Sequence, residues 1–297
     1  MNVLDIYVSA YRLLYDRSWL HYRVLSPFRY LLRREAAKRL PVYLAKPYKR
    51  SLNIQKGLIV SFTSFPDRIK NVWQVVECML RQTVLPEKII LWLSKEQFPS
   101  MDSLPQSIKG RINDIFEVRL VDGDIKSHKK YYYVSKEFRN NLVFLIDDDI
   151  YYPTDIIDRS LKNKINNNVV CNYSRIIEYD VNGKHLPYSQ WKDNVFKKKG
   201  KDIFLGTGGG TLLRFSELFN DVSNINLAMS LTPTADDVWI NAMIRLANLK
   251  IETVSNGFFL PIEVKYKRTL SSINVGLSMN DKQILAIEKY YGNCFDK

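Results

Sequence analysis

Cysteine and histidine are scarce in this chain of 297 residues, with three residues of each type. The cysteines, Cys78, Cys171 and Cys294, are odd in number and far apart. This excludes a disulfide framework and a cysteine-rich zinc module, and it fits a reducing compartment. Because the histidines are scattered as well, we expect any bound metal to be a hard ion held by carboxylates.

Long apolar runs are also missing. No uninterrupted apolar run reaches about 18 residues, so we expect no membrane-spanning helix. The first residues lack the apolar core and cleavage site of a secretory signal, so we expect the protein to stay in the cytoplasm. Glycine and proline are few, at 12 and 11 residues, whereas 46% of the chain is hydrophobic. This composition excludes a disordered or collagen-like chain and leaves one large domain or two modest ones.

Positive charge is plentiful, and it is concentrated at the N-terminus. The net charge is +13, and residues 1–50 alone contain eleven Lys and Arg against three acidic residues. Large aromatic residues such as Trp19, Tyr22 and Phe28 lie among them. This mixture predicts a helical segment that lies on an anionic membrane surface, on the inner face of the plasma membrane. The alternative is a helical hairpin that packs on the main domain. We expect no nucleic-acid partner, because no recognised binding module accompanies the basic stretch.

From residue 57 onward, short apolar strands alternate with amphipathic helices. Strands are expected at 57–62, 88–93, 116–120 and 142–146, and helices at 72–80 and 132–138. The order predicts an α/β domain over 51–297, with a mostly parallel central sheet and flanking helices. In the second half we expect helices at 154–165, from 234 and at 281–290, and strands at 251–254 and 258–261. The Asn182-Gly183 turn predicts a hairpin of 169–179 with 184–187.

Three consecutive aspartates, Asp147, Asp148 and Asp149, follow the strand expected at 142–146. Ligands of open α/β sheets bind outside the carboxyl ends of the strands. Alternate residues of an extended segment face the same way, so Asp147 and Asp149 can point at one spot. Three adjacent carboxylates repel each other, and a divalent cation shared with a diphosphate would neutralise them. The alternative is a solvated acidic turn.

A second acidic pair, Asp236 and Asp237, lies at the expected start of a helix. Thr234 and Asp237 have the spacing of a capping box, which would explain one aspartate structurally. A carboxylate at a helix start beside a cleft can equally serve as a general base. The sequence leaves both interpretations open.

The glycine-rich loop 206–210 can bring its backbone close to a ligand, or it can simply form a tight turn. It is neither a P-loop nor a dinucleotide fingerprint. Three basic residues, Arg68, Lys129 and Lys130, could meet a diphosphate or could be surface charges.

Several segments together resemble bacterial glycosyltransferases of GT-A fold, of the family-2-like kind with a DxD motif. They span about 57–285 and comprise 61–69, 82–83, 89–93, 96–99, 127–130, 145–153 and 233–239. The resemblance implies a nucleotide-binding half at about 57–150 and an acceptor half at about 151–297. It also implies a nucleotide-sugar donor, Mn2+ or Mg2+, and a cell-surface glycan or lipid-linked saccharide as acceptor.

The resemblance further implies roles for individual residues. Asp149 would ligate the metal with help from Asp147, and Asp147 and Asp148 would touch the nucleotide. Asp237, beside Asp236, would be the base that deprotonates the acceptor. Further donor contacts would come from Thr63, Phe65, Arg68, Lys129, Lys130, Gly208 and Gly209. The family's C-terminal histidine ligand has no counterpart here, so water, phosphate or Asp281 would take its place.

The sequence therefore predicts a metal-dependent, inverting glycosyltransferase, with a UDP-sugar as the favoured donor. A retaining transferase would share the aspartate triplet without needing a base at Asp237. A sugar nucleotidyltransferase would normally carry a glycine-rich, basic loop after the first strand, where this chain has 63–66. A non-enzymatic basic binding protein would leave the two acidic clusters unexplained.

Overall fold

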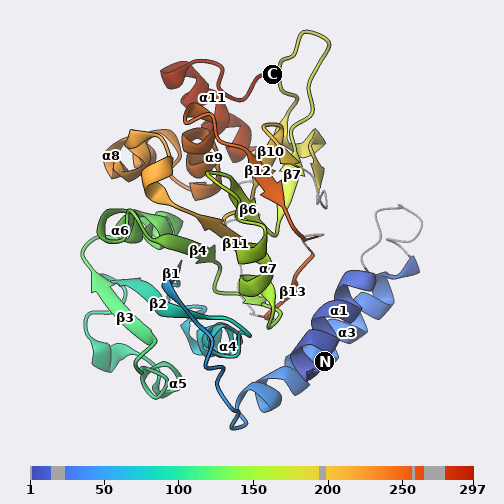
Figure 1. The fold of residues 1–297 in the computed structure, drawn as a ribbon, viewed down its shortest axis with the longest axis vertical. Coiled ribbons are helices and arrows are strands. Elements are labelled where there is room, and N and C mark those ends of the chain that lie inside the picture. The colour runs from blue at the N-terminus through green and yellow to red at the C-terminus, as the bar shows by residue number, and fades with distance from the viewer. Residues whose placement is uncertain (1, 15–23, 194–198, 256–257, 264–277) are drawn as a thin grey trace.

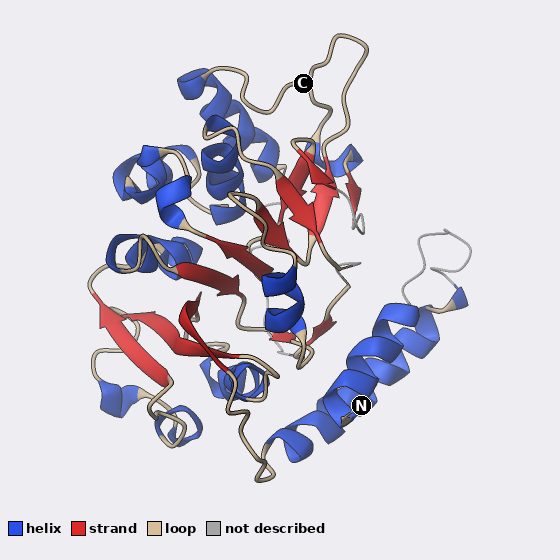
Figure 2. Cartoon of the chain, viewed as in Figure 1, coloured by secondary structure: helices blue, strands red, loops and turns tan. Residues whose placement is uncertain are grey.

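The computed structural model describes residues 2–14, 24–193, 199–255, 258–263 and 278–297. An eight-stranded sheet runs through it in the order β3-β2-β1-β4-β11-β6-β12-β9 (Figures 1 and 2). Its strands are β1 Ile54–Thr63, β2 Leu85–Ser94, β3 Phe116–Val121, β4 Leu142–Ile146, β6 Val169–Cys171, β9 Lys199–Gly200, β11 Gly209–Leu213 and β12 Ile251–Thr253. All of them run in one direction except β11 and β9. The predicted α/β class with a mostly parallel sheet is confirmed.

Helices cover both faces of the sheet because both faces of its strands are apolar. Along β1, Val60 and Phe62 join one buried cluster, whereas Ile59 joins the other. Packed against the first cluster are α4 Ile69–Leu80, α5 Gln106–Lys109 and α7 Ile156–Lys162. Packed against the second are α6 Lys129–Glu137, α8 Ile225–Leu231, α9 Asp236–Leu246 and α11 Met279–Tyr291. Near-continuous apolar strands are typical of a sheet buried on both sides.

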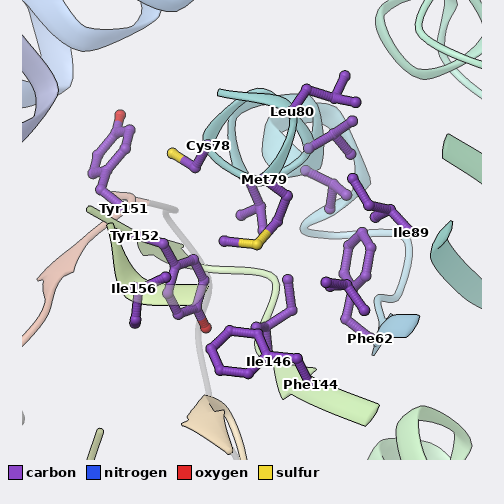
Figure 3. Packing of buried hydrophobic residues seen from close by; sticks show 14 of the residues in the cluster. Phe62, Cys78, Met79, Leu80, Ile89, Phe144, Ile146, Tyr151, Tyr152 and Ile156 are labelled. Carbon is purple, nitrogen blue, oxygen red and sulfur yellow. The ribbon is translucent and has the colours of Figure 1, made fainter. Parts of the chain in front are cut away.

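The core beneath the end of β4 fixes the chain that follows this strand. Figure 3 shows Tyr152 lying against Phe144 and Ile146 of β4, with Met79 of α4 across from them. Tyr152 is fully buried, so the surrounding side chains fix the position of its ring. The backbone N–H of Asp147 donates a 2.8 Å hydrogen bond to the Tyr152 hydroxyl. The packing therefore determines where the aspartate triplet leaves the sheet.

Two small sheets complete the second half. They are β10 Ile203–Leu205 with β7 Ser174–Ile176 and β8 Lys192–Asp193, and β13 Leu260–Pro261 with β5 Ile150–Tyr151. The hairpin prediction is wrong in extent. Its first strand divides at Asn172 and Tyr173, because the Asn172 amide donates to the Gly210 carbonyl and the chain crosses to another sheet. The turn itself forms, but its flanks pair at the Tyr179–His185 bridge instead of along two strands.

The N-terminal segment forms two helices, α1 Val3–Leu13 and α3 Ser26–Leu44, that lie side by side (Figure 1). Leu4 and Val8 of α1 and Leu40 of α3 are buried in the cluster that α4 shares. Both helices thus agree with the alternative interpretation, a helical hairpin that packs on the main domain. Trp19 and Tyr22 lie outside the described residues. Among the helices that the structure describes, none is long and apolar enough to cross a bilayer.

Polar contacts also fasten this hairpin to the domain. The Thr154 N–H and hydroxyl donate to the Asp5 carboxylate at 2.9 and 2.6 Å. Arg81 donates to the carbonyls of Leu44 and Lys46. Thr154 and Leu44 are buried, and these bonds give partners to the N–H of the first and the carbonyl of the second.

We expect Asp5→Ala to lower the free energy of unfolding by about 1–3 kcal/mol, because it leaves the buried N–H of Thr154 without an acceptor. Glu35→Ala is the matched control, since the partners of Glu35 among the described residues are the exposed Lys38 and Arg39 on its own helix. That change should cost about 0.2–0.5 kcal/mol. Urea unfolding of both variants measures the difference, and equal costs would contradict the described docking of α1.

Candidate active site

The aspartate triplet lies between β4 and β5, next to the start of β11. The Asp147 N–H donates to the Gly208 carbonyl as well as to Tyr152. Asp147 and Asp149 line a cleft of about 400 Å³, whereas Asp148 is buried beneath it with 5% of its surface exposed. The expectation that the first and third aspartates share a direction agrees with this placement.

Asp148 is a structural member of the triplet. Its carboxylate accepts hydrogen bonds of 2.5 Å from both the Ser64 hydroxyl and the Arg68 guanidinium. Arg68 also lies 3.0 Å from Asp149. Burial, only partly offset by Arg68, and the neighbouring carboxylates raise the pKa of Asp149 to about 7.

The second acidic pair faces the same cleft from the start of α9. Thr207, in the glycine-rich loop, donates its N–H to Asp237 Oδ1 at 2.8 Å, and its hydroxyl lies within donating distance of both Asp237 Oδ1, at 2.5 Å, and Asp236 Oδ2, at 2.7 Å. Asp237 lines the cleft, whereas Asp236 is buried behind it. The capping-box interpretation is wrong: α9 has no side-chain cap, and the Thr234 N–H donates to Gln283 instead.

Lys130 connects the two acidic groups. Its ammonium lies 2.7 Å from Asp147 and 2.9 Å from Asp236, and its side chain is 5% exposed. Burial alone would lower the pKa of Lys130, but Asp147, Asp236 and Asp237 outweigh it and raise the pKa, so the lysine stays charged. Burial would also raise the pKa of Asp236, but Lys130 lowers it overall.

Asp237 has a different environment from Asp236. Burial and the adjacent Asp236 carboxylate raise the pKa of Asp237 to about 6. The pKa values of the two acids are thus driven apart: Asp236 stays ionised beside Lys130, whereas the pKa of Asp237 is about 6. Such a separation is typical of acid–base sites.

The glycines of the loop make room for side chains of the site. A Cβ on Gly208 would lie 1.7 Å from an Asp147 carboxylate oxygen, and a Cβ on Gly209 would lie 2.4 Å from Tyr173. Both glycines line the cleft. The loop is therefore more than a tight turn, because only a residue without a side chain lets Asp147 take its observed position.

The cleft has a surplus of negative charge. Besides Asp193, which pairs with Arg175, five carboxylates gather at its floor and walls, those of Asp147, Asp148, Asp149, Asp236 and Asp237. Their basic partners within the described chain are Arg68 and Lys130. One oxygen of Asp147 and one of Asp149 make no hydrogen bond or ion pair with the described residues. Hard oxygen donors facing a cleft with unbalanced negative charge fit Mn2+ or Mg2+.

Other predicted site residues lie outside the cleft lining. Thr63 donates to the Trp92 carbonyl at the end of β1, and Phe65 stacks 5.3 Å from the Arg68 guanidinium. Lys129 is buried and pairs with Asp124, so it makes no contact with the aspartates. Asp281 accepts from the Tyr188 N–H and does not line the cleft. The donor-binding roles of Thr63, Phe65 and Lys129 stay predictions.

Several cleft residues have no signal in the sequence. Tyr11 comes from α1, Tyr173 from the break between β6 and β7, and Asp193 from β8. Phe258 and Phe259 complete the wall, and the Arg12 guanidinium donates to the Phe258 carbonyl. These positions depend on long-range packing that no local motif records.

Comparison with known proteins gives distant likenesses in structure only. No protein family and no curated protein matches the sequence. The mannosyltransferase PcManGT from Pyrobaculum calidifontis, solved with GDP-Man and Mn2+, has 9% identity and a TM-score of 0.48, covering 86% of this chain and 72% of that one. The 4-diphosphocytidyl-2C-methyl-D-erythritol synthase from Anaerococcus prevotii has 13% identity and a TM-score of 0.41, covering 76% and 98%. HddC from Yersinia pseudotuberculosis has 13% identity and a TM-score of 0.36, covering 58% and 79%. At these scores the likenesses carry no argument, and the fold rests on the strand order described above.

Proposed function

We propose that this protein is a metal-dependent glycosyltransferase that moves a sugar from a nucleotide sugar to an acceptor hydroxyl. A UDP-sugar is the favoured donor, and the acceptor is a cell-surface glycan or a lipid-linked saccharide. The observation that carries the proposal is the meeting of two acidic groups in one cleft, with Asp147 and Asp149 on one side and Asp237 on another. A cleft of about 400 Å³ is in the range of small-molecule sites.

Asp147 and Asp149 would hold Mn2+ or Mg2+, which, when bound, neutralises the charge on the departing nucleoside diphosphate. Lys130 and Arg68 keep the two carboxylates in place by pairing with one oxygen of each. Gly208 and Gly209 leave room for the donor to lie against the backbone of the loop.

Asp237 takes the proton of the attacking acceptor hydroxyl. The Thr207 N–H holds Oδ1 at 2.8 Å, so Oδ2 is the oxygen that would receive the proton in the cleft that Asp237 lines. As the acceptor oxygen bonds to the anomeric carbon, the bond from that carbon to the diphosphate breaks, and the proton stays on Asp237. Attack from the side opposite the leaving group inverts the anomeric centre.

Two alternatives make different demands on these residues. A retaining transferase would need no base at Asp237, although this carboxylate lines the cleft. A nucleotidyltransferase would normally carry a basic glycine-rich loop after β1, where Ser64, Phe65 and Pro66 lie. The inverting glycosyltransferase accounts for both acidic groups at once.

We expect Asp149→Asn to abolish the Mn2+-dependent stabilisation by UDP, which at 100 times the dissociation constant is worth about 2.7 kcal/mol. In EDTA the same variant should melt no lower than wild type, because it removes one surplus negative charge. Asp193→Asn is the matched control: Asp193 lines the same cleft but pairs with Arg175 at 2.6 Å. Thermal shifts with UDP and Mn2+ decide the matter, and unchanged stabilisation of Asp149→Asn by UDP would refute the metal assignment.

We expect Asp237→Asn to lower turnover by a factor of roughly 10² to 10⁴ while UDP binding persists. Because the pKa of Asp237 is about 6, wild-type kcat/KM should fall as the pH drops below that value and the base becomes protonated. Asp236→Asn should mainly lower stability, since it removes a charge partner of buried Lys130. Turnover and melting temperature of both variants measure this. A fully active Asp237→Asn would rule out this carboxylate as the base.

We also propose that the outer face of the α1–α3 hairpin binds an anionic membrane surface. Leu13, Phe28 and Leu31 are 83%, 57% and 54% exposed, and the exposed Lys38 and Arg39 lie farther along α3. Apolar side chains beside basic ones are typical of interfacial helices. Because Tyr11 of the same hairpin lines the cleft, this surface would bring a lipid-linked acceptor close to Asp237.

Vesicle sedimentation tests the membrane proposal. Phe28→Ser with Leu31→Ser should release the protein from phosphatidylserine vesicles without lowering its melting temperature, and high salt should weaken wild-type binding. Leu52→Ser is the control, because Leu52 is 91% exposed but lies outside both helices. Equal sedimentation of the double variant and wild type would contradict the assignment of this face.

A further inference from the structure

A second group of metal-ligating side chains lies away from the cleft, where the C-terminal segment meets the Asn182–Gly183 turn. His185 follows the turn, Glu288 lies on α11, and Asp296 is next to the last residue. One ligand atom from each of the three lies within 4.8 Å of the other two. None of the three lines the cleft. Figure 1 shows α11 and the C-terminus at the same end of the molecule.

The imidazole of His185 is oriented as a ligand. Its Nδ1 lies 3.1 Å from the Leu186 carbonyl, which can only accept, so Nδ1 carries a hydrogen and donates it. Its Nε2 lies 3.1 Å from Glu288 Oε2. A backbone carbonyl that accepts from one ring nitrogen fixes the ring and leaves the other nitrogen to bind a metal, as is usual for metal-bound histidines. Two lone pairs at this distance would repel each other, so either a proton on Nε2 or a bound cation must compensate them.

Glu288 supplies an independent sign that a partner is missing. It is 8% exposed, and its Oε1 has no hydrogen-bond partner in the described chain. Neither Glu288 nor Asp296 forms an ion pair with a lysine or arginine of the described residues. A buried carboxylate oxygen without a partner is costly, and such groups in proteins are normally paired or bound to a metal.

We propose that His185, Glu288 and Asp296 bind a divalent transition-metal ion, with Zn2+ as the best fit. A neutral imidazole and two carboxylates carry two negative charges, which a divalent ion balances. The imidazole favours Zn2+ over Mg2+ and Ca2+, and three protein ligands with one water complete a tetrahedral site. The site would fasten the C-terminal segment to the turn, beside the bond from the Lys297 N–H to the Gly183 carbonyl. It is independent of the proposed transferase activity.

The test uses the full chain carrying Asp149→Asn, without nucleotide, so that the cleft does not contribute. We expect one equivalent of Zn2+ to bind and to raise the melting temperature, and Co2+ to give the visible absorption of a tetrahedral site. Glu288→Gln and His185→Ala should each weaken Zn2+ binding at least tenfold. Asp281→Asn, on the same helix α11, is the matched control and should bind as the parent does.

Three outcomes would overturn the proposal. One is the absence of stoichiometric Zn2+ binding, and another is equal affinity in Glu288→Gln. The third is a melting temperature that responds to pH but not to metal, which would show that a proton holds His185 and Glu288 together. Should His185→Ala fail to fold, Glu288→Gln still decides, because it keeps the shape of the side chain. A failure here leaves the cleft assignments untouched, since none of the three residues lines the cleft.

Discussion

The ammonium of Lys130, buried between Asp147 and Asp236, joins the two halves of the candidate active site. One aspartate follows β4 and the other begins α9, so this lysine positions both a proposed metal ligand and the neighbour of the proposed base. The lysine is itself fixed: its carbonyl accepts from the Ser61 hydroxyl at 2.5 Å, and Ser61 Oγ accepts from the Trp92 indole at 2.9 Å. Breaking this pair would leave buried charge without compensation, which is strongly destabilising.

Because Lys130 is shared between two carboxylates, the cleft keeps unbalanced negative charge. Lys130 and Arg68 are too few for the carboxylates around them, and these carboxylates add to the effect of burial, which raises the pKa of Asp149 to about 7. Carboxylates that repel each other in the free protein gain most when a cation and its ligand enter. The same crowding, together with burial, raises the pKa of Asp237 toward the pH at which a base works best. The repulsion between these carboxylates lowers the stability of the free protein, although the proposed function requires them to lie close together.

The sequence predicts what depends on local pattern. Apolar runs predict buried strands such as β1 and β4, and an aspartate triplet at the end of such a strand indicates a ligand-binding site. The spacing of Thr234 and Asp237 predicted a capping box that does not form, because the Thr234 N–H donates to Gln283 on α11 and not to Asp237. The place of Tyr11 in the cleft lining could not be predicted from the sequence, because it depends on the docking of α1.

Which bond of the donor breaks is the most direct test of the proposed function. The protein is incubated with Mn2+ and UDP-, GDP- or dTDP-sugars, and in parallel with nucleoside triphosphates and sugar 1-phosphates. A glycosyltransferase cleaves the bond at the anomeric carbon, so phosphorus NMR should detect free nucleoside diphosphate from one nucleotide sugar and no pyrophosphate in the parallel reaction. Pyrophosphate released from a triphosphate and a sugar 1-phosphate would contradict the proposal and identify a nucleotidyltransferase instead.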